Sequence, residues 1–332
     1  MKNILIVKPG AIGDLLQMTP VFRALKRAYP GCRITLMVGP GGTTSLFRYL
    51  PTVDEVLVFD KKGEHRRLAT FLALRREIGQ RRFDLVLNFQ RSNLKAWLLV
   101  SAAFPCRLLV YHKARTRIVH AVVNHLETLA PLGIGTDDTA LEFYPGPEAE
   151  AWAANLFAAS GFDAKTVIAL NPGASHPVNR WSSRSFAELA DLLDREFGAA
   201  LILVGGKDDR MLADEVVAHA RCRPLVLTGE TDLLQLGAVL KRCDILVSGD
   251  TGPMHMATAV GTRVIALFGA ADPARTGPIG EGHRVMQAEG VDCLPCRSRR
   301  CARSTYLECM EKITVDAVIR EIASMIRDEK GR

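Results

Sequence analysis

The chain has 332 residues, of which 48% are hydrophobic, and a formal net charge of +7. A chain of this length and apolar content can bury two cores, so we expect two domains. No run of 18 uncharged apolar residues occurs, which argues against a membrane span, and the early charges do not fit a signal peptide. Eight cysteines at this length do not make a small disulfide scaffold, so a reducing cytoplasm is expected.

The positive charge is concentrated in the first half of the chain. Residues 1–146 hold 7 Lys and 14 Arg against 6 Asp and 5 Glu, a net charge of +10, whereas the remainder carries −3. Such a field favours an anionic partner: nucleic acid, an anionic lipid surface or an acidic small molecule. Aromatic residues make up only 6% of the chain and do not alternate with the cations, which argues against single-stranded nucleic acid.

The first half alternates between buried-strand patterns and helical patterns. It opens with a strand at 3–8, a glycine-bearing loop at 9–14 that carries Asp14, and a helix from Thr19-Pro20 to about Tyr29. The loop lacks the G-x-G-x-x-G spacing of a dinucleotide-binding turn. The alternation continues with strands at 33–38, 55–59, 84–88 and 106–110 and helices at 42–50, 64–82, 93–104 and 118–132. This order predicts a doubly wound parallel sheet.

A turn-rich passage near residues 132–147 marks the expected boundary between two domains, 1–146 and 147–332, with the final helix free to pack back on the first. The second domain repeats the alternation. Its strands are expected at 166–170, 200–204, 225–228, 244–248 and 263–268, and its helices at 148–160, 183–197, 210–220 and 232–242. Polar loops follow four strands, at 171–182, 205–209, 249–255 and 269–273. Because parallel strands end at one edge, these loops are expected to border a ligand crevice.

The stretch 248–261 is the most informative of these. Its strand ends in a polar turn, Thr251 or Gly252 is placed to cap the next helix, and Pro253 is expected at the first helical position. Unpaired N–H groups at a helix start bind anions, most often phosphate. The alternative is an ordinary strand–turn–helix connection, because such turns are common.

Five motifs occur in one order along the chain. They are 8–15 (KPGAIGDL) with Thr19-Pro20, 171–174 (NPGA), 180–181 (RW), 249–255 (GDTGPMH) and 267–273 (LFGAADP). In order and spacing, from residue 3 to about 325, the chain resembles the heptosyltransferases of glycosyltransferase family nine. The resemblance implies the GT-B architecture, an α/β fold in which two Rossmann-like doubly wound domains face a central cleft. It also implies a metal-independent, inverting transfer of heptose from a nucleotide diphosphate heptose, usually ADP-heptose, to the inner core of lipopolysaccharide.

The resemblance carries the role of general base onto Asp14. A carboxylate there takes the proton of the acceptor hydroxyl as that oxygen attacks the anomeric carbon. A structural loop carboxylate, satisfied by backbone donors, is the alternative.

For the donor, the resemblance assigns roles to the strand-end loops of the second domain. The diphosphate is expected at Thr251, Gly252 and Pro253, the sugar at Asp250, and the ribose at Asp209 or its neighbour Asp208. His255 either hydrogen-bonds a phosphate or caps the core, and Asp209 is also a first-turn acid favoured by the helix dipole. The family often has Lys where this chain has Asn179, so Arg180 is the candidate cation for the leaving phosphate.

The acceptor implied by the resemblance is anionic, with sugar carboxylates and lipid phosphates, which matches the basic first half. Its candidate cations are Lys61, Lys62, Arg66, Arg67, Arg91, Lys95, Arg115 and Arg117. A cytoplasmic monomer is expected, in peripheral contact with the anionic inner membrane and without nucleic acid. The alternatives are a GT-B glycosyltransferase that uses another nucleotide sugar and a non-catalytic nucleotide- or nucleic-acid-binding protein.

Four cysteines stand within 17 residues in the spacing Cys293-x2-Cys296-x4-Cys301-x7-Cys309. Four thiols at this spacing suit a structural zinc site, with reduced metal-free thiols and adventitious disulfides as the alternatives. The chain has no D-x-D motif, so nothing indicates a metal-bound diphosphate, and no cofactor is expected to be required for catalysis.

Overall fold

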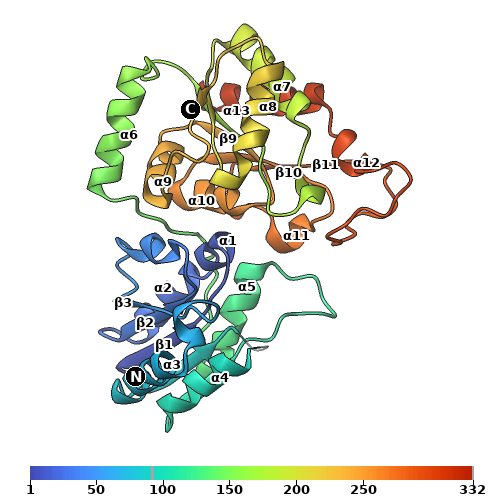
Figure 1. The fold of residues 1–332 in the computed structure, drawn as a ribbon. Coiled ribbons are helices and arrows are strands. Elements are labelled where there is room, and N and C mark those ends of the chain that lie inside the picture. Colours follow the sequence, from blue (N-terminus) through green and yellow to red (C-terminus); the bar gives the residue numbers. More distant parts are fainter. Residues whose placement is uncertain (91–92, 331–332) are drawn as a thin grey trace. The chain divides into compact units, whose positions relative to one another are not determined.

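The computed structural model describes residues 1–90 and 93–330. The chain divides into two compact units, Met1–Tyr144 and Pro145–Arg332, each built on a parallel sheet (Figure 1). The division falls after residue 144, where the sequence predicted a boundary after 146. Two parallel α/β units confirm the predicted fold class.

The sheet of the first unit has the strand order β3-β2-β1-β4-β5, and every neighbouring pair is parallel. The strands are β1 (Asn3–Val7), β2 (Arg33–Val38), β3 (Glu55–Val58), β4 (Leu85–Asn88) and β5 (Arg107–Val110). The central strand, β1, is solvent-excluded from Ile4 to Val7. Burial on both faces explains why it reads as an uninterrupted apolar run.

The helices of the first unit are shorter than the sequence predicted. They are α1 (Ile12–Leu16), α2 (Thr19–Ala28), α3 (Leu68–Gln80), α4 (Leu94–Val100) and α5 (Ala121–Leu126), with 3-10 segments η1 (Thr43–Phe47), η2 (Glu64–Arg66), η3 (Ser101–Ala103) and η4 (Glu127–Leu132). The helix expected over 64–82 breaks because Arg67 is extended. The helix expected over 118–132 continues only as a 3-10 segment, with Pro131 inside it.

The prediction that Asp14 lies on a loop is wrong. Residues Ile12–Leu16 form α1, with Asp14 in its first turn, and Leu15 N–H donates to the carbonyl of Ala11 (3.0 Å). The residue that caps this helix, Ala11, has no side-chain hydrogen-bonding group. The usual Ser, Thr, Asp or Asn signal is therefore missing, which is why the sequence pattern did not reveal the helix.

The sheet of the second unit has the order β11-β10-β9-β6-β7-β8. The strands are β6 (Val167–Asn171), β7 (Ala200–Leu203), β8 (Leu225–Val226), β9 (Ile245–Gly249), β10 (Arg263–Phe268) and β11 (Arg284–Gln287). The edge strand β11 was not predicted, because it is only partly buried and lacks a continuous apolar run. The chain builds outward from β6 on one side and from β9 on the other, so the topological switch point lies between these two strands.

The helices of the second unit are α6 (Pro147–Ala159), α7 (Ser183–Phe197), α8 (Arg210–His219), α9 (Leu233–Lys241), α10 (Gly252–Val260), α11 (Pro273–Thr276), α12 (Glu308–Glu311) and α13 (Val315–Lys330), with 3-10 segments η5 (Pro177–Asn179) and η6 (Lys207–Asp209). They include those that the sequence predicted, and the short helices α11 and α12 were not predicted. Ser182 caps α7 by accepting from Ser185 N–H (3.0 Å).

The final helix, α13, packs against α7 and β10, and Val318, Ile322 and Met325 are buried in the core of the second unit. Figure 1 shows α13 in red and α7 in yellow-green. Within residues 1–90 and 93–330, no helix combines the length and the apolar content needed to cross a bilayer.

Candidate active site

The loops after β6 and β9 meet at the switch point of the second sheet. Asn171, the last residue of β6, donates from Nδ2 to Ser248 Oγ (2.9 Å) and to Thr251 Oγ1 (3.0 Å). All three side chains are buried. Thr251 is the N-cap of α10, so these bonds fix the start of that helix beside the end of β6. The helix begins at Gly252, which places Pro253 at its second position rather than the predicted first.

Gly249 lets the loop after β6 lie directly on the end of β9. A Cβ added at Gly249 would stand 2.6 Å from the carbonyl oxygen of Asn179. The side-chain oxygens Asn179 Oδ1 and Asn171 Oδ1 are buried and have no hydrogen-bond partner among the described residues. A buried acceptor without a donor costs free energy, so a shift of either side chain toward a donor is favoured.

Arg180 hydrogen-bonds within the loop after β6, whereas Trp181 packs into the core of the second unit. Trp181 is buried, packs edge-on against Phe186, and donates from Nε1 to the carbonyl of Ile313 (2.9 Å). Arg180 is half-buried and donates from Nε and Nη2 to the carbonyl of Ala174 (3.1 and 2.9 Å). A guanidinium has five N–H donors, so the two hydrogen bonds to Ala174 leave other donors for an anion.

Asp250 lies in the loop after β9, and its partners come from α10 and α11. Thr276 Oγ1 donates to its Oδ2 (3.1 Å), and His255 Nε2 stands 3.8 Å from its Oδ1. His255 is buried in the first turn of α10. Asp272, which the sequence argument did not single out, caps α11 and pairs with Arg275 (3.3 Å). Asp250 is therefore held in position from two sides, as a residue that orients a sugar hydroxyl needs to be.

The two acidic residues after β7 differ in their surroundings. Asp209 Oδ2 accepts from Gly206 N–H (3.0 Å), and the carboxylate occupies the space that a Cβ at Gly173 would take. Asp209 thus joins the β7 loop to the β6 loop, a structural role that the sequence did not predict. Asp208 is exposed and is the freer carboxylate for a ribose hydroxyl.

In the first unit, Asp14 stands over the end of the central strand. Lys8, the residue after β1, places its Nζ 3.7 Å from Asp14 Oδ1. The Lys8 side chain is 12% exposed and that of Asp14 is 52% exposed. A Cβ at Gly10 would come within 3.1 Å of Asp14 and 3.2 Å of Lys8, so glycine allows these two side chains to meet. The carboxylate that the resemblance marks as the base is open to solvent and oriented by a cation.

Beside this pair lies an aromatic cluster that the sequence argument missed. Phe89 stacks on Tyr111 (5.3 Å between ring centroids), and His125 packs against both rings (5.4 and 5.1 Å). Burial raises the pKa of Tyr111, and the charges of Asp14 and Glu127 raise it further. These residues lie far from Asp14 in the sequence, and only the adjacency of β1, β4 and β5 brings them together.

His125 is buried and neutral at physiological pH. Burial, with the nearby charge of Lys8, lowers its pKa to about 3. Its Nδ1 lies 3.3 Å from the carbonyl of Gln17. A carbonyl only accepts, so Nδ1 carries the proton and ties α5 to the residue after α1.

We expect this histidine to make stability depend on pH. Unfolding returns the pKa of His125 from about 3 toward 6.5, so its contribution is complete above pH 6.5 and is lost as the pH falls toward 3. Relative to His125→Phe, the parent should show an extra slope of up to ~1.4 kcal/mol of unfolding free energy per pH unit in that window. Denaturant titrations at several pH values measure the difference, and equal slopes would contradict it.

The predicted acceptor cations fall into separate groups. Lys61, Lys62, Arg66 and Arg67 are exposed and follow β3, whereas Arg115 and Arg117 follow β5. Both groups lie at the carboxyl edge of the sheet, but β3 and β5 are its opposite edge strands, roughly 19 Å apart at ~4.8 Å per strand. One small ligand cannot contact both groups.

The remaining two predicted cations belong to the β4 connection. Lys95 is half-buried in the first turn of α4, and Arg91 lies outside the described residues. The group after β5 borders a cavity of about 480 Å³, which His112 and Lys113 also line. Arg117 there is paired with Glu127 (2.5 Å). This cavity is one place for an anionic group beside the cations after β5.

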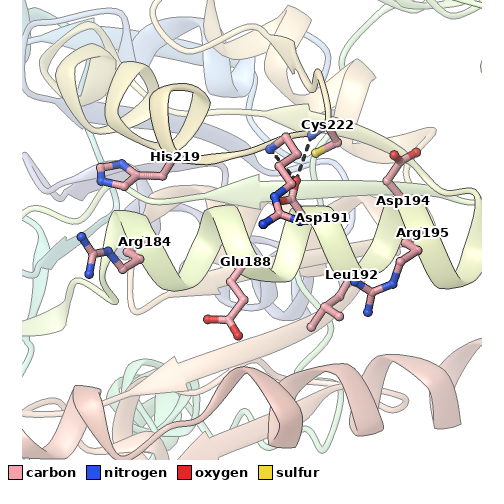
Figure 2. Close-up of a pocket in the computed structure, with 9 residues that line it drawn as sticks. Arg184, Glu188, Asp191, Leu192, Asp194, Arg195, His219 and Cys222 are labelled. Atoms are coloured by element: carbon pink, nitrogen blue, oxygen red, sulfur yellow. Dashed lines mark hydrogen bonds between the residues drawn. The ribbon is translucent and has the colours of Figure 1, made fainter.

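A second cavity, of about 610 Å³, lies between α7 and the connection that leads into β8. Figure 2 shows Asp191 at its centre, accepting from the backbone N–H groups of Arg221 (2.7 Å) and Cys222 (2.9 Å). Burial opposes ionisation of Asp191, but these bonds lower its pKa. The connection enters β8 at its amino end, and no predicted site residue lines this cavity. Asp191 therefore has a structural role there.

The four clustered cysteines surround one cavity of about 230 Å³. Burial raises the pKa of Cys309, and the proximity of Cys293, Cys296 and Cys301 raises it further. None of the eight cysteines, all of which lie in the described ranges, forms a disulfide.

Two Rossmann-like units, each with polar and charged residues at the carboxyl edge of a parallel sheet, match the GT-B architecture. Residues 71–307 match the sequence model of glycosyltransferase family 9 (heptosyltransferase). The match spans more than half of the chain, which belongs to this family. The resemblance inferred from the five motifs is thereby confirmed.

Similar proteins span the whole chain. The lipopolysaccharide heptosyltransferase 2 of Escherichia coli K12 is 26% identical over 99% of this chain and 100% of its own. The crystal structure of a family 9 glycosyltransferase from Veillonella parvula has a TM-score of 0.86 at 25% identity, covering 98% of each chain. The structure of the Escherichia coli ADP-heptose lipopolysaccharide heptosyltransferase II has a TM-score of 0.80 at 23% identity, covering 99% of this chain and 100% of that one.

Proposed function

We propose that this glycosyltransferase transfers heptose from ADP-heptose to the inner core of lipopolysaccharide, with inversion at the anomeric carbon and without a catalytic metal. The observation that carries the proposal is the start of α10, which Asn171 holds against the end of β6 at the switch point. Family membership supports heptosyl transfer, and the names of the similar Escherichia coli proteins support the donor and the acceptor.

In this proposal the second unit holds the donor. The diphosphate lies at the first turn of α10, where the N–H groups of Gly252 and Met254 have no carbonyl of their own helix to bind. Arg180 adds a guanidinium from the loop after β6. Asp250 contacts the sugar and Asp208 the ribose. Helix N–H groups and a guanidinium together stabilise the charge that develops on the leaving phosphate.

The first unit supplies the base and the acceptor surface. Asp14 takes the proton of the acceptor hydroxyl while that oxygen attacks the anomeric carbon. The bond from that carbon to the phosphate oxygen breaks, and its electron pair leaves with ADP. Lys8 orients the carboxylate. We also expect the protein to act as a monomer, in contact with the cytoplasmic face of the inner membrane through its basic residues.

A donor panel tests the proposal. Purified protein with a core-truncated lipopolysaccharide acceptor should release ADP from ADP-heptose, and the initial rate should be unchanged by a chelator. UDP- and GDP-sugars should support much slower release. Preference for another nucleotide sugar would replace the donor assignment, and a requirement for added divalent metal would contradict the metal-free mechanism.

Neutralising the cations after β3 should weaken acceptor binding. Replacing Lys61, Lys62, Arg66 and Arg67 with Gln removes four exposed charges, so KM for the acceptor should rise and its dependence on salt should become weaker. Donor affinity should not change. The matched control removes four exposed charges from the second unit, with Arg184, Arg195, Arg221 and Arg223 replaced by Gln. An equal effect in the control, or a loss of donor affinity in the test variant, would contradict the assignment of the acceptor to the first unit.

A further inference from the structure

The cavity lined by the four cysteines lies in the segment between β11 and α13. Cys293, Cys296 and Cys301 come from the long connection after β11, and Cys309 lies on α12. The four cysteines differ in exposure: Cys296 is exposed, Cys293 and Cys301 are half-buried, and Cys309 is buried. Four thiols from two segments of the chain therefore face one space.

This segment is attached to the loops of the donor site. Arg297 N–H donates to the carbonyl of Ala270 (2.7 Å), in the loop after β10. Val178, the neighbour of Asn179, and Ala270 both line the cysteine cavity. A Cβ at Gly269 would stand 3.1 Å from Cys309 Sγ. The thiols thus lie against the loop after β6, which carries predicted donor contacts, and against the loop after β10, which is expected to border the same crevice.

The surroundings of the thiols are cationic. Arg300 and Arg303 line the same cavity, and Arg303 also pairs with Glu308 (2.9 Å). Four thiolates around one divalent ion leave a net charge of −2, which Arg300 and Arg303 offset in part, since Glu308 also lines the cavity. Leu307 N–H donates to Cys301 Sγ (3.4 Å), a bond that favours the ionised sulfur. Charge and hydrogen bonding both suit a thiolate site.

We propose that Cys293, Cys296, Cys301 and Cys309 bind one tetrahedral metal ion, zinc or iron, which fixes the connection after β11 against the loops that hold the donor. A four-thiolate ligand set is typical of these two metals. Each cysteine loses its thiol proton to solvent as it binds. The role is structural, so it does not alter the metal-free chemistry proposed for the transfer.

The fit requires a small rearrangement. Within residues 1–90 and 93–330, no three His, Cys, Asp or Glu side chains already stand at coordination distance from a common point. All four cysteines nevertheless line one cavity. Rotation of the cysteine side chains about χ1, together with a shift of the exposed Cys296, is the change that the proposal demands.

The test measures metal in the whole chain, expressed in medium that contains both zinc and iron. Elemental analysis should find close to one ion per chain in the parent. Cys301→Ser and Cys296→Ser should lower the metal content to background. The matched control, Cys106→Ser, alters a half-buried cysteine of the first unit and should keep the ion. Metal loss in the control as well would contradict the assignment.

A second measurement uses only the parent protein, so it does not depend on whether the cysteine variants fold. The parent, stripped with a chelator and reloaded with Co²⁺ alone, should show the intense thiolate-to-cobalt absorption of a tetrahedral site. Stripping should lower the melting temperature and raise KM for the donor, with kcat little changed. Parent protein that holds no metal and has four reactive thiols, or a disulfide within the cluster, would overturn the proposal. Failure of sugar transfer with metal still bound would bear only on the proposed function.

Discussion

Replacing Asp14 with Asn should reduce turnover by about 10²-fold or more while donor binding stays close to that of the parent. An amide has nearly the size of a carboxylate and accepts the same backbone hydrogen bonds, but it cannot take a proton at neutral pH. The Asp14 side chain is half-exposed in the first turn of α1, so the substitution should not disturb the core. Steady-state rates and donor titration on one preparation measure both quantities.

The matched control is Asp137→Asn, which removes an exposed carboxylate from the same unit and should leave turnover unchanged. Turnover of Asp14→Asn within a few-fold of the parent would remove Asp14 from the mechanism. It would then remain a partner of Lys8 that shapes the loop after β1.

Gly249→Ala should have the second large effect, this time on the donor. The new methyl group would stand 2.6 Å from the backbone carbonyl of Asn179, which cannot rotate away, so the loop after β6 must move. Overpacking of this kind costs about 1–3 kcal/mol of stability. The same loop carries Arg180 and the buried Asn171 contact to Thr251, so donor affinity should fall by about tenfold or more, as 1.4 kcal/mol corresponds to a factor of ten.

Gly135→Ala is the control for this prediction. It adds the same methyl group where no atom lies within 4 Å, and its backbone has no positive φ. Stability and donor affinity of the control should match those of the parent. Unchanged donor affinity in Gly249→Ala would mean that the loop after β6 does not shape the donor site.

Much of the fold follows from periodicity. The buried strands β2 and β10 and the helix α7 have the bounds that the sequence predicted, because each combines a regular apolar pattern with clear ends. The errors occur where that information is weak. Ala11 offers no capping side chain to mark α1, and the half-exposed β11 has no continuous apolar run.

The site was predicted less completely than the fold. Motifs at strand ends singled out Asp14, Arg180 and Asp250 as candidates, since one residue type at one turn carries that information. The partners of these residues are set by strand order, which a single sequence does not display. Lys8 and Asp14 are close in the sequence, between the end of β1 and α1. Tyr111 and His125 lie near Asp14 only because β5 and α5 bring them to the same edge of the first sheet.

The acceptor cations show the same limit. Their density in the sequence suggested one field, yet the order β3-β2-β1-β4-β5 sends two groups of them to opposite edge strands. The sequence gives the number of cations, but their positions relative to one another depend on the order of the strands.

The most direct test of the central proposal is analysis of the transfer product by mass spectrometry and NMR. The enzyme, ADP-heptose and a core-truncated lipopolysaccharide acceptor should give an acceptor that gains one heptosyl residue for each ADP released. The new glycosidic bond should have the anomeric configuration opposite to that of the donor. Retention of configuration, or release of ADP without a heavier acceptor, would contradict inverting transfer with Asp14 as the base.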